Sequence, residues 1–213
     1  AIFKSFNSFR VLTPVNDGVF GVKNLNTEIL NRALQEVKRM SAKHAETKNT
    51  EAKNKLSSSV LATSLDEKWF PGLPYMITKN NKELGVFNGD IGICVFDEEW
   101  HKVIRFENGR TLYPSMLPDV VPAFVLSIHK SQGSEFNHTM VLIPSYGGRL
   151  LCRELVYTAV TRAKGLVSIL GEAMAIDMVL PLFPKSNPII ESNSRKNTPI
   201  HKYSALPMFS VRL

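Results

Sequence analysis

Hydrophobic residues in the first forty positions pass from a short continuous run to a spaced pattern. The run FRVLTPV at residues 9–15 is apolar and is closed by turn formers at 16–18, as expected for a buried strand. From 25 to 40, apolar side chains three and four positions apart predict an amphipathic helix. Its predicted buried face consists of Leu25, Ile29, Ala33, Leu34 and Val37.

A polar segment follows the helix, and a section rich in strand signals comes after it. Residues 41–68 offer little to bury, so we expect a mobile loop or a frayed helix extension there. Between 72 and 122, FENGRTLY places an Asn-Gly pair between two strand-like runs, which is a strong hairpin signal. No long helical pattern interrupts this section. It predicts a small barrel of about five short strands inserted into an α/β domain.

Strands and helices alternate again in the last third of the chain. AFVLSI and residues 139–144 are predicted strands, 152–165 a helix and 166–171 a further strand. A last short helix is expected next, and the tail from Lys185 lacks any period and is expected to be loosely ordered. This alternation predicts a parallel sheet covered by helices, that is, an α/β fold.

Charge and composition narrow the class of protein. Lys and Arg number 26 against 19 Asp and Glu, a net charge of +7. Such an excess suits a polyanionic partner such as nucleic acid, or it marks a merely basic soluble protein. Hydrophobic residues make up 44% of the chain, enough for the core of one domain, with or without a small insertion. No apolar run approaches the roughly 18 residues of a membrane span, and we expect no signal peptide.

The two cysteines bear on the cellular compartment of the protein, and the first residue bears on whether the chain is part of a longer protein. Cys94 and Cys152 are far apart and no metal-ligand spacing of Cys and His exists, so we expect no zinc site and a reducing, cytoplasmic location. The chain begins at Ala1 and enters a strand almost at once, so we expect it to be cut from a longer protein.

Candidate chemistry gathers in SIHKSQGSEF, residues 127–136, directly after an apolar strand. Polar groups that follow a parallel strand are expected at the carboxyl edge of the sheet, where α/β folds bind ligands. Gly133 would let a backbone approach closely, and Glu135 could accept hydrogen bonds from ribose hydroxyls. The alternative is a polar turn capped by Ser131 and Ser134. The candidate phosphate donors are Ser127, His129, Lys130 and Ser131.

A second candidate lies on the predicted helix ELVYTAVTRAKG. Thr158 and Arg162 share a face four positions apart, and Arg162 could direct its guanidinium fork at a phosphate. An arginine that only complements the helix dipole is the alternative. No glycine is followed by lysine anywhere, so the phosphate loop G-x-x-x-x-G-K-[ST] is absent from this chain.

These two segments, LSIHKSQGSEF and RELVYTAVTRAK, resemble motifs V and VI of superfamily-one helicases. The closer resemblance is to the RecD family, the alpha subunits of bacterial exodeoxyribonuclease V, and it extends to NKELGVFNGDIGICV (81–95) and FRVLTPVNDGVFGVKNLN (9–26). It covers nearly all of residues 9–171 outside the 41–68 loop. Relatives usually have threonine where Ser127 stands, and often an arginine in the turn that is Asn16-Asp17-Gly18 here.

The resemblance implies a fold and a division of labour. Such helicases bind ATP between two RecA-like domains, and this chain resembles the second, with an inserted SH3-like β-barrel. The phosphate loop and the acid that holds Mg²⁺ would lie in the N-terminal motor domain, upstream of Ala1. The implied divisions are 1–40 for the first part of RecA-like domain 2, 41–71 for a polar loop, 72–122 for the barrel, 123–184 for the remainder and 185–213 for a loosely ordered tail.

The resemblance also implies roles for single residues. Arg162 would be the arginine finger that reaches the γ-phosphate of ATP, positioned by Tyr157 and Thr161. Glu135 would face the ribose. The residues implied to face the nucleotide are Gln132, Gly133, Glu135 and Arg162. Those implied to lie near single-stranded DNA are Ser127, His129, Lys130 and Ser131.

The function implied is that of the C-terminal part of an ATP-dependent 5′-to-3′ DNA helicase. It would be the RecD subunit of a RecBCD-type exodeoxyribonuclease V acting in double-strand break repair and recombination, with RecB- and RecC-like partners. Without the phosphate loop, this chain alone is expected to be inactive. The alternatives are a stand-alone RecD-like helicase, a DNA- or protein-binding module without catalysis, or a degenerate paralogue.

Overall fold

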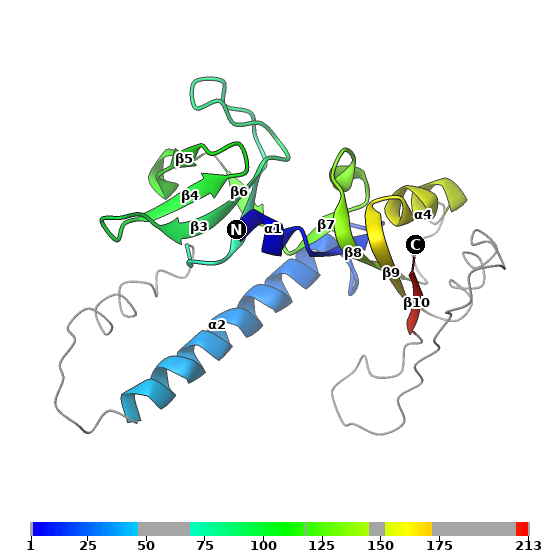
Figure 1. The fold of residues 1–213 in the computed structure, drawn as a ribbon, viewed down its shortest axis with the longest axis horizontal. Helices are drawn as coiled ribbons and strands as arrows, with labels where there is room; N and C mark the ends of the chain where they lie inside the picture. Colours follow the sequence, from blue (N-terminus) through cyan, green and yellow to red (C-terminus); the bar gives the residue numbers. More distant parts are fainter. Residues whose placement is uncertain (1, 47–68, 118, 145–151, 172–207, 213) are drawn as a thin grey trace. The chain divides into compact units, whose positions relative to one another are not determined.

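Two compact units make up the chain (Figure 1). The computed structural model describes residues 2–46, 69–117, 119–144, 152–171 and 208–212. The first unit comprises Ala1–Leu25 and Phe124–Leu213, and the second comprises Asn26–Ala123. The boundary therefore falls within the long helix α2 (Val22–Glu46), whereas the sequence-based division assigned all of residues 1–40 to the first domain.

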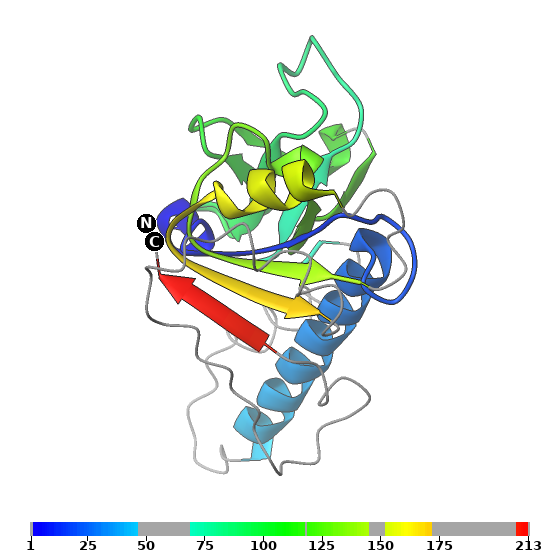
Figure 2. The same cartoon turned by 90° about the vertical axis from the view of Figure 1, so that its right-hand side faces the viewer.

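A five-stranded sheet forms the centre of the first unit, in the order β10-β9-β8-β1-β7. Its parallel strands are β1 (Phe9–Thr13), β7 (Val125–Ser127), β8 (Phe136–Ile143) and β9 (Ala163–Gly171). The helix α4 (Arg153–Val160) packs against β8 and β9 (Figure 2). The predicted α/β fold with a parallel sheet is confirmed.

One strand of this sheet was not predicted. β10 (Met208–Arg212) pairs with β9 in the antiparallel direction, as the opposed arrows in Figure 2 show. The prediction of a loosely ordered tail is therefore wrong for residues 208–212. The predicted helix after residue 171 and most of the predicted polar loop, residues 47–68, lie outside the described residues.

The core of the first unit contains one charged side chain among the described residues. Arg10 of β1 is only 2% exposed, and burial lowers its pKa to about 10. Its guanidinium carbon lies 3.6 Å from the centroid of the Phe6 ring and 5.0 Å from that of Phe136, and its Nη2 donates to the Phe6 carbonyl at 3.2 Å. The cation is thus stabilised by aromatic faces and by the short helix α1 (Ile2–Phe6).

The helix predicted over 152–165 is shorter in the structure. α4 ends at Val160, and β9 begins at Ala163 rather than at residue 166. Ala163 pairs with Phe136 of β8, whose N–H donates to the Arg162 carbonyl at 2.8 Å. These strand contacts override the helix propensity of Ala163 and Lys164.

Helix α2 is longer than predicted at both ends. It begins at Val22, where the Leu25 N–H donates to the Gly21 carbonyl at 3.0 Å, and it continues to Glu46. The apolar face is as expected, since Ile29 and Leu34 are partly buried while Arg32 is exposed. No helix in the described part of the chain is both long and apolar enough to cross a membrane.

The second unit contains an antiparallel sheet of five strands in the order β5-β4-β3-β2-β6. Its strands are β2 (Pro74–Ile77), β3 (Ile91–Phe96), β4 (Lys102–Phe106), β5 (Thr111–Leu112) and β6 (Val120–Pro122). The predicted Asn-Gly hairpin joins β4 to β5, with Gly109 at φ 85°. At the centre of β3, burial raises the pKa of the Cys94 thiol to about 11. The prediction of about five short strands in this section is confirmed.

Candidate nucleotide and nucleic-acid site

The chain between β7 and β8, residues 128–135, crosses the sheet from one edge to the other, and we call it the crossing segment. Ser127 pairs with Thr13, so β7 ends at the carboxyl edge. β8 begins at Phe136, before the pairing of Phe9 with His138, and therefore starts at the amino edge. The polar residues directly after β7 therefore lie at the carboxyl edge, as expected, whereas Glu135, directly before β8, lies at the amino edge.

At the carboxyl edge, two serines shape a turn. The Ser127 hydroxyl accepts from the Lys130 N–H at 3.3 Å, and the Ser131 hydroxyl donates to the Ile128 carbonyl at 2.7 Å. Ser131 is fully buried and Ser127 nearly so. A direct phosphate contact by Ser131 does not fit this burial, whereas the hydroxyl bond of Ser131 fits its part in the alternative of a capped turn. His129 and Lys130, on the 3-10 turn η2 (His129–Ser131), are exposed.

The middle of the crossing segment is exposed backbone and polar side chains. Gly133 has φ 83°, a conformation that glycine adopts without steric cost. Gln132, Ser134 and Glu135 are exposed beside it. The Ser134 N–H donates to the Ser131 carbonyl at 3.0 Å, which ties this stretch back to η2. The residues of this segment that were predicted to face a nucleotide are therefore accessible to solvent.

Arg162 lies at the amino edge, in the turn between α4 and β9, and three oxygens hold its guanidinium. Nε donates to the Thr158 carbonyl at 3.2 Å, and Nη1 donates to the Ser134 carbonyl at 3.4 Å. Nη2 donates to Thr161 Oγ1 at 3.4 Å. The side chain is partly buried, so the fork is oriented while part of it remains accessible. Such a held, permanently charged fork suits a phosphate ligand.

Glu135 joins Arg162 at the same edge. Glu135 directly precedes Phe136, whose N–H donates to the Arg162 carbonyl. Glu135 Oε2 lies 3.0 Å from Lys164 Nζ. Both members of this ion pair are more than half exposed, so water screens it and its contribution to stability is small. The carboxylate remains accessible to a ligand from solvent.

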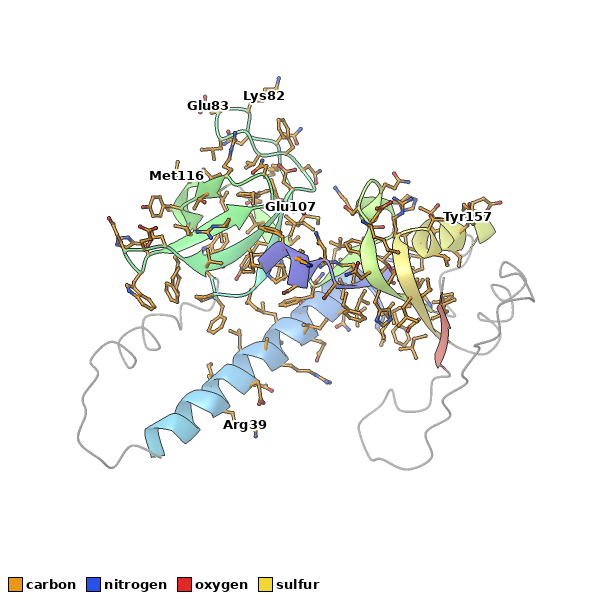
Figure 3. The ribbon with its side chains drawn as sticks, in the orientation of Figure 1. Arg39, Lys82, Glu83, Glu107, Met116 and Tyr157 are labelled. Carbon is orange, nitrogen blue, oxygen red and sulfur yellow. The ribbon has the colours of Figure 1, made fainter. Side chains whose placement is uncertain are left out.

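The two predicted positioning residues differ in what they do. Thr161 fits its predicted role, because its hydroxyl accepts from Arg162 and donates to the Thr158 carbonyl at 3.0 Å. The Tyr157 side chain is 64% exposed and projects from α4 (Figure 3). Tyr157 contributes its carbonyl, which accepts from the Thr161 N–H at 3.0 Å. The positioning of Arg162 by Tyr157 stays a prediction, and the contact that supports it is this backbone hydrogen bond to Thr161.

Sequence reasoning missed three partners of the site: the carbonyls of Ser134 and Thr158, and the ammonium of Lys164. Backbone carbonyls have no sequence signature, since every residue carries one. Lys164 was assigned to a helix, and only the earlier start of β9 brings it beside Glu135.

The turn after β1 lies at the carboxyl edge. It contains Asn16, Asp17 and Gly18 where relatives often have an arginine, and Asp17 accepts from Lys23 Nζ at 2.8 Å. Thr13 at the end of β1 donates its hydroxyl to the Phe20 carbonyl at 2.8 Å, which fixes the turn. Within the described ranges, no group of three or more His, Cys, Asp or Glu could hold a metal ion.

Comparison with known proteins identifies relatives among DNA helicases. The family model of the UvrD-like helicase C-terminal domain matches residues 122–170, which contain the crossing segment, α4 and Arg162. The RecBCD enzyme subunit RecD of Haemophilus influenzae is 36% identical over 172 residues, or 81% of this chain and 23% of that protein. The subunit of the same name from Mycolicibacterium smegmatis is 42% identical over 103 residues, or 48% and 18% respectively.

Two further matches carry the name of helicases. The ATP-dependent RecD2 DNA helicase of Deinococcus radiodurans is 31% identical over 106 residues, 49% of this chain and 15% of that protein. A crystal structure of Pif1 helicase from Bacteroides in complex with ADP-AlF3 and ssDNA covers 84% of this chain and 43% of its own, with 18% identity and a TM-score of 0.40.

The sequence similarity covers both the crossing segment and the Arg162 turn. The chain spans at most about a quarter of the length of the curated relatives named above. It matches several RecD subunits over this part and contains the C-terminal helicase domain. Over this part, the chain is similar to the RecD family of superfamily-one DNA helicases.

Proposed function

We propose that this chain supplies the second RecA-like motor domain of an ATP-dependent 5′-to-3′ DNA helicase. The observation that carries this proposal is Arg162, held by three oxygens at the amino edge of the sheet beside Glu135. In this proposal the Arg162 fork stabilises the negative charge that develops on the γ-phosphate of ATP in the transition state. Glu135 accepts hydrogen bonds from the ribose, and Gln132 and Gly133 line the nucleotide.

In this proposal, the crossing segment connects the residues that face the nucleotide to the residues that contact DNA. Its Glu135 end lies at the edge that holds Arg162, and its η2 end exposes His129 and Lys130 at the other. These two side chains would contact DNA backbone phosphates without reading sequence. Ser127 and Ser131 would act through the turn they hold, not by touching DNA.

ATP enters this proposal together with Mg²⁺. The residues of this chain supply a cation for the phosphates and a carboxylate for the ribose, and the metal would be held by the N-terminal motor domain of the same protein. Two exposed donors at η2 and the net charge of +7 suit single-stranded DNA as the second ligand.

The second unit and the partners complete the proposal. Five short antiparallel strands inserted between α2 and β7 fit an SH3-like β-barrel insertion. The RecD relatives carry the name of a RecBCD subunit, so RecB- and RecC-like partners, a cytoplasmic location and a role in break repair are proposed for the whole protein.

The test is ATP turnover by the full product of the same gene, with and without single-stranded DNA. We expect DNA to stimulate turnover, and Arg162→Ala to lower it about 10³-fold or more while nucleotide binding changes little. Arg32→Ala, which removes an exposed arginine of α2, is the matched control. Ordinary turnover by Arg162→Ala would remove the arginine finger, and a silent parent protein would favour a binding module.

A further inference from the structure

The second unit exposes an aromatic side chain at the turn between β3 and β4. Trp100 is 54% exposed, and its one ring contact among the described residues is with Phe96, with ring centroids 5.7 Å apart and an interplanar angle of 51°. A tryptophan normally contributes to stability by burying its large ring. More than half of the surface of this residue is in contact with water, so burial of Trp100 contributes little to the stability of the turn.

The backbone at Trp100 makes this residue type unfavourable there. Its φ is 65°, and it is the one non-glycine residue at positive φ in the described part of the chain. Glycine or asparagine occupies that region at little steric cost, whereas a bulky side chain is strained. An exposed, strained tryptophan indicates a function outside the fold of the unit.

Four hydrogen bonds fix the backbone of the turn from which the Trp100 ring projects. The Asp97 carboxylate accepts from the Glu99 N–H at 3.0 Å and from the His101 N–H at 2.8 Å. The Asp97 N–H donates to the His101 carbonyl at 3.0 Å, and the Trp100 N–H donates to the Asp97 carbonyl at 3.2 Å. A ligand that binds at this turn therefore does not need to order its backbone.

Further exposed apolar groups adjoin the turn. The His101 ring lies 6.5 Å from the ring of Tyr113, which is 49% exposed. The Tyr113 carbonyl accepts from the N–H of Met116, which is 48% exposed and projects from this unit (Figure 3). We call Phe96, Trp100, Tyr113 and Met116 the aromatic surface. Aromatic residues and methionine are enriched at protein–protein interfaces.

The charge beside the aromatic surface is negative, although the chain as a whole carries +7. Asp97, Glu98 and Glu99 come directly before Trp100, and Glu98 and Glu99 are exposed. Across residues 96–102 these three carboxylates stand against Lys102 and the His101 imidazole, whose Nδ1 lies 3.7 Å from Asp97 Oδ2 and 3.5 Å from Glu99 Oε2. A DNA backbone would be repelled here, whereas a cationic segment would be attracted.

We propose that the aromatic surface with its three carboxylates docks a basic segment of a partner polypeptide, with an arginine or lysine of that segment over the Trp100 ring. A cation over an indole face is favourable, most of all where adjacent carboxylates add to the attraction. Tyr113 and Met116 would take apolar side chains of the same segment. This surface is distinct from the proposed nucleotide and DNA contacts, so the proposal does not depend on them.

The test measures peptide binding by the full gene product. The probe is a short fluorescein-labelled peptide in which arginines alternate with leucine and serine. The control peptide has citrulline in place of every arginine. We expect the arginine peptide to bind more tightly, and Trp100→Gly to weaken its binding about tenfold or more. The double variant Glu98→Gln with Glu99→Gln should also weaken it, and added salt should do the same.

Three controls distinguish a polypeptide ligand from DNA and from a purely structural role of the ring. Phe87→Ala removes a 52% exposed aromatic ring elsewhere in the unit and should leave peptide binding unchanged. The urea midpoint of Trp100→Gly should equal or exceed that of the parent, and a large drop would make the ring structural and overturn the proposal. Affinity for oligo(dT) should not change. A loss of DNA affinity as large as the loss of peptide affinity would assign Trp100 to DNA and overturn the proposal as well.

Discussion

At the scale of single residues, Glu135 offers a test that separates the nucleotide from the rest of the site. Its carboxylate is exposed, and it forms an ion pair with the Lys164 ammonium at 3.0 Å. If it accepts from ribose hydroxyls, Glu135→Ala in the full protein should raise the KM for ATP by about tenfold, the order expected for a charged hydrogen bond. Steady-state turnover with ATP and with 2′,3′-dideoxyATP measures this, because the second nucleotide has no hydroxyl to lose.

Lys164→Ala is the matched control for this prediction. It removes the other member of the ion pair and leaves the carboxylate in place, so the KM for ATP should change less. An equal rise of KM for ATP and for 2′,3′-dideoxyATP in Glu135→Ala would show that the carboxylate does not bind the ribose hydroxyls.

Lys130 is the residue on which the DNA side of the proposal can be tested. It is exposed on η2, at the edge opposite Arg162. Lys130→Ala should weaken binding of single-stranded DNA equally for oligo(dT) and oligo(dA), because a phosphate contact reads no base. The slope of log K against log salt should fall by about 0.7, the value for one phosphate contact to a single strand.

A salt titration of DNA binding by the full protein makes this measurement. Lys164→Ala removes a lysine at the amino edge and should leave the slope unchanged. If the slope of Lys130→Ala equals that of the parent, Lys130 does not neutralise a phosphate.

The residues of the candidate site were accessible to sequence reasoning, while their contacts were not. Arg162 and Glu135 stand in motifs with a fixed order of side chains. What holds Arg162 is largely the carbonyls of Ser134 and Thr158, and any residue type provides a carbonyl. Tyr157 is a similar case, since its ring is exposed and its contact toward Arg162 runs through its carbonyl, which accepts from the Thr161 N–H.

At the scale of elements, strand pairing determines the secondary structure where the local sequence pattern does not distinguish a helix from a strand. Residues 161–165 contain Thr, Arg, Ala, Lys and Gly, which do not distinguish a helix end from a strand start. The pairing of Ala163 with Phe136 decides it, and this contact joins residues far apart in the sequence. The span of the crossing segment was not predicted for a related reason: its composition shows a polar turn, but only the register of β7 and β8 on β1 shows that it spans the sheet.

Gly92 tests the packing of the antiparallel sheet. It lies in β3 opposite Phe106, and a Cβ there would overlap Ile104 Cγ2 and approach Phe106 Cε1 at 3.1 Å. Gly92→Val should therefore lower the free energy of unfolding by about 1–3 kcal/mol through overpacking. Urea unfolding of this chain, followed by tryptophan fluorescence, measures the change, because Trp69 is buried in the same unit.

Gly109 provides the control. It has φ 85° and open space around a Cβ, so Gly109→Ala should cost about 1–2 kcal/mol from backbone conformation alone. Replacing Gly109 by asparagine, which tolerates positive φ better, should recover part of that cost, whereas Gly92→Asn should not. Recovery at both positions would mean that Gly92 is not limited by Ile104 and Phe106.

At the scale of the whole molecule, the proposed function requires two halves, of which this chain would supply one. Arg162 and Glu135 come from the described first unit, while G-x-x-x-x-G-K-[ST] is absent from the sequence. The isolated chain should therefore hydrolyse ATP no faster than its own Arg162→Ala variant, because an arginine finger acts only on a nucleotide that another site holds. It should still bind single-stranded DNA weakly and with strong salt dependence, since Lys130 and the net charge of +7 remain. Parallel assays of phosphate release and DNA binding on the isolated chain and the full product test both statements. Turnover by the isolated chain that disappears in Arg162→Ala would show that the chain completes a nucleotide site without the phosphate loop.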